Sequence, residues 1–184
     1  MTLRVLTLCG SLRARSSNRA MLLAYERAAP DMAFTHYAGI GELPHFNPDL
    51  DGEGKPVPSE VAGLRDAVAG ADALVISTPE YVHALPGAFK NALDWLVSDP
   101  AFIGKPVVIL HRAHGSSWAL ESLREVLRTM SAEVIEDATA LLPLETNQID
   151  ETAILARDDL RLLLLGSAAA LRATLDRKTN QAPV

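Results

Sequence analysis

The side chains with the clearest chemical potential follow directly on a short apolar run near the N-terminus. They are hydroxyl, guanidinium and amide groups, in the order Ser11, Arg13, Arg15, Ser16, Ser17 and Asn18. A helix-like pattern follows at once. Backbone N–H groups at the start of a helix carry partial positive charge and favour a bound phosphate. Serine hydroxyls and arginine guanidinium groups add further donors. The segment therefore predicts a phosphate-binding loop.

The loop lacks the spacing of two common nucleotide-binding motifs. It contains neither G-x-x-x-x-G-K-[ST], typical of P-loop NTPases, nor G-x-G-x-x-G, typical of dinucleotide-binding Rossmann domains. The alternative is a polar connection in which Ser16 or Ser17 only caps the helix, since serine is a common N-cap.

A second segment of interest spans residues 79–95, PEYVHALPGAFKNALDW, directly after a buried apolar run. Pro79 and the Pro86-Gly87 pair predict a rigid turn that brings backbone close to a ligand. Apolar residues then recur at helical spacing, which predicts a helix with one apolar face. They are Phe89, Ala92, Leu93 and Leu96. We expect residues 79–81 to contact the ligand and the helix to be structural.

Strand-like and helix-like patterns alternate along most of the chain. Strands are expected at residues 3–8, 33–37, 73–77 and 106–110 and within 133–142. Helices are expected at residues 18–29, 59–69, 86–97, 117–130 and 152–178. The last helix should be interrupted or kinked near Gly166, and residues 39–58, rich in Gly, Pro and Asp, should form a long loop.

This alternation predicts an α/β fold, a three-layer sandwich with helices on both faces of a parallel sheet. Five strands favour a flavodoxin-like order, 2-1-3-4-5. In that order ligands bind beyond the carboxyl ends of strands 1 and 3, where both segments of interest lie. The 184 residues suit one domain, residues 1–184.

The composition disfavours some classes of binding partner. The net charge is −6 and no Lys/Arg-rich run occurs, which disfavours nucleic acid. The apolar stretch at residues 162–171 is too short to span a bilayer, and no signal-peptide pattern is present. Cys9 is the only cysteine, which fits a reducing cytoplasm. We expect a cytoplasmic protein without membrane contact.

The two segments together resemble the NADPH-dependent FMN reductase family, which includes quinone, chromate and azo-dye reductases. The resemblance rests on GSLRARSSN, PEY and LPGAFKNALDW, with LPHFNPDLD between them, and covers roughly residues 5–110. It implies an enzyme that passes hydride from NADPH or NADH to FMN. Electrons then go to a small acceptor: a quinone, an azo compound, a metal oxyanion or free flavin.

The resemblance also implies the cofactor contacts. Ser11, Arg13, Ser16 and Asn18 would hold the FMN phosphate, with Ser17 adjacent; Pro79, Glu80, Tyr81 and Val82 would contact the flavin; and His114 and Gly115 lie in a third loop that neighbours it. His114 could equally be a solvated loop histidine.

Two departures from the family stand out. Many relatives carry Asn where this chain has Val82, so one hydrogen bond near the flavin is expected to be missing. The third loop, residues 112–117, has one glycine where relatives often have a Gly-Gly pair, which could narrow the pocket or alter specificity.

No catalytic side chain is required, because the cofactor carries the redox chemistry. His36, His45, His83 and His111 show no metal-ligand spacing, so no metal site is expected. Relatives are commonly homodimers or homotetramers. The helix at residues 89–96 and the loop at residues 39–58 are the candidate subunit contacts.

Two rival functions remain open. Cys9 and Arg15-Ser16 form C-x5-R-S, which resembles low-molecular-weight tyrosine phosphatases, where a thiolate attacks phosphorus. That mechanism needs an Asp-Pro pair late in the chain, and Asp99-Pro100 is badly placed for it; a buried, inert Cys9 is the simpler reading. The other rival is a non-catalytic flavodoxin-like binding module.

Overall fold

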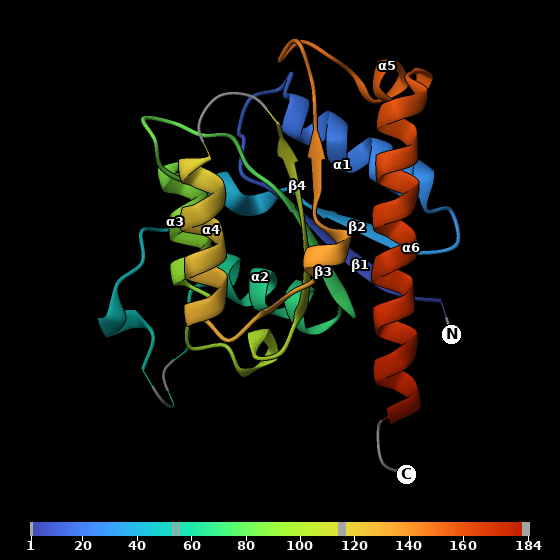
Figure 1. Cartoon of the computed structure of the whole chain (residues 1–184). Coiled ribbons are helices and arrows are strands. Elements are labelled where there is room, and N and C mark those ends of the chain that lie inside the picture. Colours follow the sequence, from blue (N-terminus) through green and yellow to red (C-terminus); the bar gives the residue numbers. More distant parts are fainter. Residues whose placement is uncertain (1, 53, 55, 114–116, 182–184) are drawn as a thin grey trace.

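The parallel sheet has the expected strand order. The computed structural model describes residues 2–52, 54, 56–113 and 117–181. Its strands are β1 (Arg4–Cys9), β2 (Ala33–Tyr37), β3 (Ala73–Ser77), β4 (Pro106–Arg112), β5 (Glu133–Val134) and β6 (Ala140–Leu142). Five of them run in the order β2-β1-β3-β4-β5, β6 pairs with β4, and every pairing between these strands is parallel (Figure 1). The flavodoxin-like order 2-1-3-4-5 is confirmed.

The edge of the sheet beside β4 differs in detail from the prediction. The segment 133–142 forms two short strands, separated by a 3-10 turn at Glu136–Ala138. β5 pairs with the start of β4 and β6 with its end. The pairing with β6 extends β4 to Arg112, two residues beyond the predicted end.

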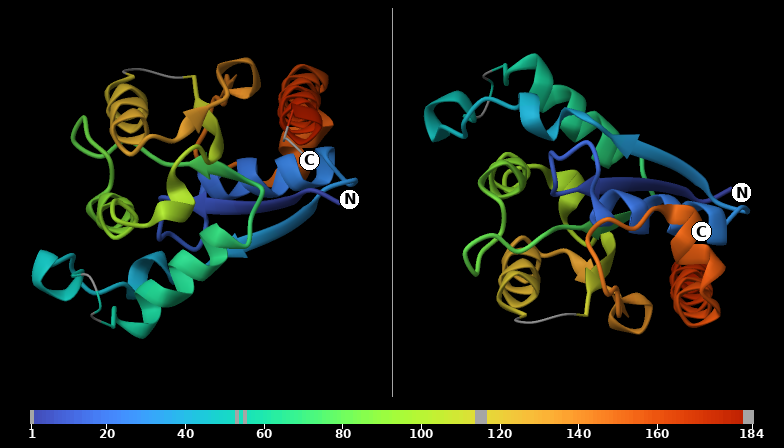
Figure 2. Two further views of the ribbon diagram at one scale, coloured as in Figure 1. Left: turned by 90° about the horizontal axis from the view of Figure 1, so that it is seen from below. Right: turned by 90° about the horizontal axis from the view of Figure 1, so that it is seen from above.

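Helices cover both faces of the sheet, as the three-layer prediction required (Figure 2). The helices are α1 (Ser17–Ala28), α2 (Ser59–Ala69), α3 (Gly87–Asp94), α4 (Trp118–Thr129), α5 (Glu151–Ala156) and α6 (Asp158–Gln181). Helices α2, α3 and α4 pack on one face with Leu74 and Ile76 of β3. Helices α1, α5 and α6 pack on the other face with Ala73 and Val75. This alternation along β3 explains why the strand is apolar throughout.

The last helical segment is interrupted at a different residue from the one predicted. The chain breaks at Arg157, which has extended backbone angles, and α6 continues through Gly166. Asp158 and Asp159 in the first turn of α6 favour a new helix start there, because carboxylates stabilise a helix N-terminus. Gly166 lies on the exposed side, where it weakens the helix without breaking it.

The apolar face of α3 belongs to the core of the chain. Phe89, Leu93 and Trp95 are fully buried. The indole N–H of Trp95 donates to the Pro44 carbonyl at 2.7 Å, and its ring meets Phe46 edge to face. The long loop therefore folds back on α3. The prediction of a subunit contact through this helix face is wrong, because these side chains are already covered within the chain.

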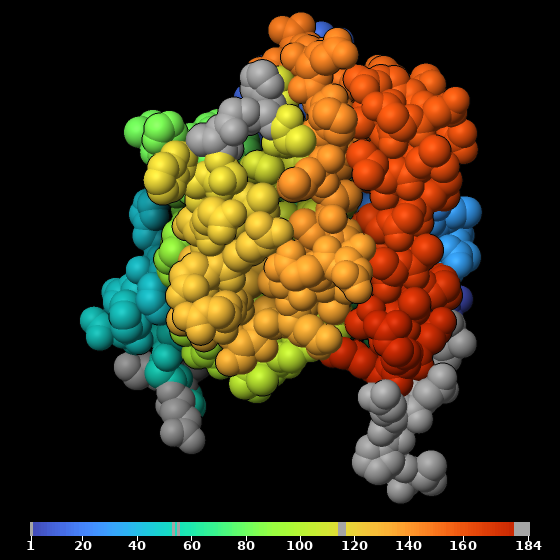
Figure 3. All heavy atoms as spheres, viewed as in Figure 1, coloured from blue at the N-terminus to red at the C-terminus, as the bar shows by residue number. Residues whose placement is uncertain are grey.

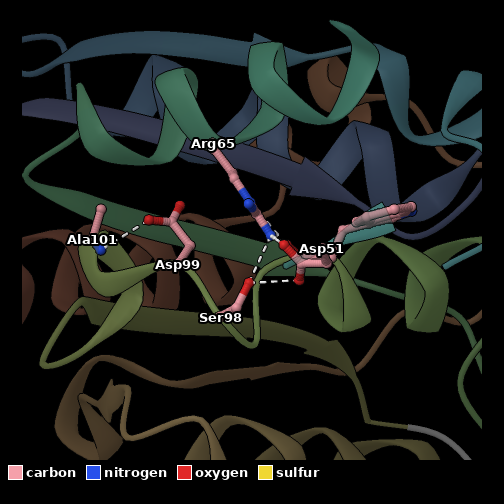
Figure 4. Close-up of polar contacts among 6 residues, drawn as sticks. Asp51, Arg65, Ser98, Asp99 and Ala101 are labelled. Carbon is pink, nitrogen blue, oxygen red and sulfur yellow. Dashed lines mark hydrogen bonds and ion pairs between the residues drawn. The ribbon is translucent and has the colours of Figure 1, made fainter. Parts of the chain in front are cut away.

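A partly buried ion pair fixes the far end of the same loop (Figure 4). Arg65 of α2 reaches Asp51 at 2.8 Å and also donates to the Trp95 carbonyl and the Ser98 hydroxyl. The side chains of Arg65 and Asp51 are only 20% and 9% exposed. Burial raises the pKa of the Asp51 carboxyl, but hydrogen bonds from Ser98 and Arg65 outweigh it, so the pKa is lowered overall.

We predict that Arg65→Met lowers the free energy of unfolding by about 2–3 kcal/mol, because it leaves the Asp51 carboxylate without its partner. The lowered pKa means that the ion pair contributes above the unfolded-state pKa and is lost as the pH falls through the folded-state pKa. Urea unfolding should therefore show a difference in unfolding free energy between wild type and Arg65→Met that becomes smaller as the pH is lowered. The matched control is Arg4→Met, whose pair with Asp72 is exposed and should matter far less. Equal losses in both variants would contradict the prediction.

Candidate functional site

A pocket of about 340 Å³ opens beyond the carboxyl ends of β1, β3 and β4. Its lining residues are Ser11, Arg13, Ser16, Ser17, Asn18, Thr78, Pro79, Glu80, Tyr81, His111, Arg112 and Asn147. The structure thus brings the two segments singled out in the sequence into one pocket. A ligand site at the carboxyl ends of strands 1 and 3 is what the strand order predicts.

Gly10 lets the two pocket segments approach each other. Its N–H donates to the Ser77 carbonyl at 2.8 Å, which extends the β1–β3 pairing by one residue. A Cβ at this position would lie 2.1 Å from the Thr78 hydroxyl oxygen. That distance is far inside van der Waals contact, so only glycine fits without moving Thr78.

The first wall of the pocket is the start of α1. Ser16 occupies the N-cap position, but its side chain makes no capping hydrogen bond. Ser17 and Asn18 are buried, and the Asn18 side-chain carbonyl accepts from the Ser77 hydroxyl at 2.9 Å. Arg13 lies exposed on the loop and forms no ion pair within the described ranges. The helix N-terminus and this guanidinium make the wall suited to an anion.

The second wall is the segment that follows β3. Glu80 accepts from the Ala119 N–H at 2.9 Å, near the start of α4. The carboxylate therefore sits at a helix N-terminus, where the backbone N–H groups carry partial positive charge. The bond joins the segment after β3 to α4, and Tyr81 lies at the pocket rim with 46% of its surface exposed.

Val82 does not join the pocket wall. Tyr81 and Ala84 exchange two backbone hydrogen bonds of 3.0 Å, which closes a two-residue turn over Val82 and His83. Both central residues have positive φ, 51° and 58°, as a type I′ turn requires. The Val82 side chain is 99% exposed, whereas the His83 ring stacks on Trp118.

Four lining residues are not among the predicted cofactor contacts, although Arg112 is the first residue of the predicted third loop. Thr78 immediately precedes the PEY motif, and its position at a strand end was the available signal. His111 and Arg112 enter the pocket because β4 is longer than predicted. Asn147 lies in the segment between β6 and α5, where no motif marks it. The predicted contacts His114 and Gly115 lie outside the described residues.

His111 and Arg112, at the end of β4, form a third wall of the pocket, and His111 is the buried titratable group of that wall. It is 8% exposed, and burial is the main cause that lowers its pKa from the ordinary value; the Glu80 carboxylate raises it and the Arg124 guanidinium lowers it further. Its neighbour Arg112 is held differently, because its guanidinium donates to the carbonyls of Leu144 and Glu145.

The groups of the phosphatase reading do not converge. Burial raises the pKa of the Cys9 thiol, which donates to the Ser11 carbonyl at 3.6 Å. A phosphatase nucleophile needs the opposite shift. Arg15 lines a neighbouring pocket with Arg19 instead of the one described above. The structure therefore favours an inert thiol.

Comparison with known proteins identifies the family. The sequence profile of NADPH-dependent FMN reductases matches residues 3–147. The chain belongs to the NADPH-dependent FMN reductase family. It is therefore an oxidoreductase that takes electrons from NAD(P)H and uses FMN. None of its described helices is long and apolar enough to cross a membrane.

Individual members of the family align over most of their length. The chain is 32% identical to a quinone reductase of Escherichia coli (strain K12) over 154 residues, 80% of this chain and 81% of the relative. It is 31% identical to an NAD(P)H-dependent FMN reductase of Pseudomonas aeruginosa over 175 residues, 92% and 94% of the two chains. In fold it is similar to FerB, a flavoenzyme NAD(P)H:(acceptor) oxidoreductase of Paracoccus denitrificans. That match has a TM-score of 0.82 and 24% identity and covers 96% and 98% of the two chains.

We predict that Val82→Asn raises the free energy of unfolding of this reductase by about 1 kcal/mol. A β-branched residue is strained at positive φ, and Asn tolerates that conformation. Urea unfolding measures the change. Val97→Asn is the control, since Val97 is also exposed but is not among the residues with positive φ. No gain at Val82, or an equal gain at Val97, would argue against strain in this turn.

We predict that Cys9→Ala retains NAD(P)H oxidoreductase activity. The raised thiol pKa also predicts slow reaction of native Cys9 with a disulfide reagent at neutral pH, compared with the urea-unfolded chain. Fast labelling of Cys9 in the native protein would contradict an inert thiol. Hydrolysis of an aryl phosphate that Cys9→Ala abolishes would support a phosphatase function.

Proposed function

We propose that the pocket beyond β1 and β3 holds FMN, with its phosphate at residues 11–18 and its ring against residues 79–81. The observation that carries the proposal is the anion-binding character of the first wall. The start of α1 has no side-chain cap, and Arg13 is not neutralised by a carboxylate in the described ranges. Ser11, Ser17 and Asn18 add polar groups to the same wall.

The residues fit the cofactor in polarity as well as in position. A phosphate needs N–H and O–H donors, and the first wall supplies them. The second wall offers Pro79, Tyr81 and Glu80, and the Glu80 carboxylate ties this segment to α4 by accepting from the Ala119 N–H. A wall fixed in this way can orient a planar ring. When bound, FMN supplies hydride chemistry, and the chain binds and orients it.

The electron acceptor is a small molecule of the quinone class, and the donor is NADPH or NADH. The E. coli relative is named for quinone reduction, which supports this class. On the chain itself, Tyr81 lines the pocket and is 46% exposed, and the exposed Trp118 precedes Ala119, whose N–H binds the pocket residue Glu80. Aromatic rings of this kind favour stacking with planar acceptors.

We further propose that residues 1–184 act as one domain in the cytoplasm and assemble as a homodimer or homotetramer. Leu162, Leu163 and Leu165 are exposed on α6, which forms one flank of the molecule (Figure 3). Apolar side chains grouped in this way are typical of subunit contacts. Sedimentation equilibrium would test the assembly, and a monomer at micromolar concentration would exclude it.

We predict that Arg13→Gln weakens FMN binding about 10-fold to 100-fold and leaves riboflavin binding unchanged. The loss corresponds to one charge-assisted hydrogen bond to the phosphate, which riboflavin lacks. Fluorescence titration of the apoprotein with each flavin measures both affinities. Arg15→Gln is the matched control, because Arg15 lines the neighbouring pocket.

Two outcomes would contradict the placement of the cofactor. Equal losses for FMN and riboflavin in Arg13→Gln would mean that Arg13 does not contact the phosphate. A larger loss in Arg15→Gln than in Arg13→Gln would move the phosphate to the neighbouring pocket. With FMN bound to the wild type, bleaching by NADPH and recovery on addition of a quinone would distinguish an enzyme from a binding module.

A further inference from the structure

A buried histidine faces the pocket without an assigned role. His111 lies near the end of β4 and lines the pocket together with residues of both other walls. It is 8% exposed, and its ring nitrogens make no hydrogen bond to any part of the chain that the structure describes. Neither nitrogen is among the polar atoms sealed from solvent. A buried imidazole with unused hydrogen-bonding capacity therefore opens onto the site.

The orientation of His111 follows from the register of its strand. Val107 and Ile109 pack into the cluster shared with α3 and α4, whereas Val108 and Leu110 pack on the opposite face. Side chains alternate along a strand, so His111 points to the same side as Ile109. That side carries the PEY segment and the start of α4, so the imidazole lies on the ring side of the proposed FMN site.

The charged and titratable groups around His111 come from four elements. They are Glu80 after β3, Arg124 on α4, Arg112 on β4 itself and, across the pocket, Arg13 and Tyr81. Glu80 is engaged by the Ala119 N–H and Arg112 by two carbonyl groups. Arginine does not release its proton at any physiological pH. His111 is the group of this set whose ordinary titration range lies near neutrality.

We propose that His111 takes up a proton when bound FMN is reduced and delivers that proton to the electron acceptor. The inference rests on the proposed placement of FMN in this pocket. Reduction by hydride adds one negative charge to the ring, next to an imidazole that is neutral beforehand. An added negative charge nearby favours the imidazolium form. The FMN phosphate is present before and after reduction, so it does not contribute to the change.

The steps balance in atoms and charge. NADPH gives a hydride to FMN, and His111 takes one proton from water, so the pair gains a hydride and a proton. A quinone then receives the hydride from the reduced flavin and the proton from the His111 imidazolium, which gives the neutral hydroquinone. FMN and neutral His111 are regenerated. The solvent supplies the proton in each turnover, and NADPH supplies both electrons.

The first test follows the His111 ring by NMR in wild-type protein with labelled histidine. Spectra are recorded against pH for the FMN-loaded protein, oxidised and then reduced under anaerobic conditions. We expect the pKa of His111 to rise by about one to three units on reduction, the range for a new charge within a few ångströms. An unchanged His111 titration would overturn the proposal.

The second test counts protons in variants. His111→Gln keeps hydrogen-bonding groups but cannot titrate, so proton uptake per two electrons should fall by one relative to wild type. The pH dependence of the flavin midpoint potential gives this number. His83→Asn removes a histidine from the exposed turn and should leave it unchanged. Unaltered proton uptake in His111→Gln would overturn the proposal.

The same spectra separate failure of this inference from failure of the proposed function. Binding of oxidised FMN should shift the backbone amide signals of Ser11 and Asn18. If those signals move but the His111 titration does not respond to reduction, FMN is in the pocket and the proton role is wrong. If FMN leaves them unmoved, the placement of the cofactor fails and this inference falls with it.

Discussion

The site depends on the close approach of two backbones where β1 and β3 leave the sheet. Gly10 donates to Ser77, and the space for its missing side chain is filled by Thr78. Any larger residue at position 10 would push the two loops apart. Because the strands are parallel and adjacent, the loop after each one then opens into the same space. The two pocket walls are thus a consequence of one contact.

The electrostatics of the site are local. The chain carries a net charge of −6, yet the wall formed by the start of α1 is suited to an anion. Charges beyond about 10 Å are largely screened in salt, so the helix N-terminus and Arg13 outweigh distant carboxylates. Glu80, the carboxylate in the pocket, is drawn to the start of α4 through Ala119. A second helix N-terminus thus holds the acidic group of the opposite wall.

The sequence predicted those features of the fold and the site that depend on residues adjacent in the chain. The segment after β1 and the PEY segment each follow directly on an apolar strand, so their types and places could be predicted from local patterns. The strand order followed from alternation and handedness. The sequence did not resolve whether Trp95 packs in the core or between subunits, because an apolar helix face looks the same in both cases. The long loop that covers Trp95 decides it.

Long-range pairing explains the part of the site that local patterns missed. Predicted strand 106–110 ends before two polar residues, yet β6 pairs with Leu110, His111 and Arg112 and continues the strand. The partner segment lies about thirty residues further along the chain, beyond any local window. Pairing fixes the alternation of side chains, so His111 turns towards α4 and Arg112 towards the carbonyl of Leu144. The third wall of the pocket therefore exists because β6 pairs with the end of β4. This pairing sets both the burial of His111 and the side to which its ring points.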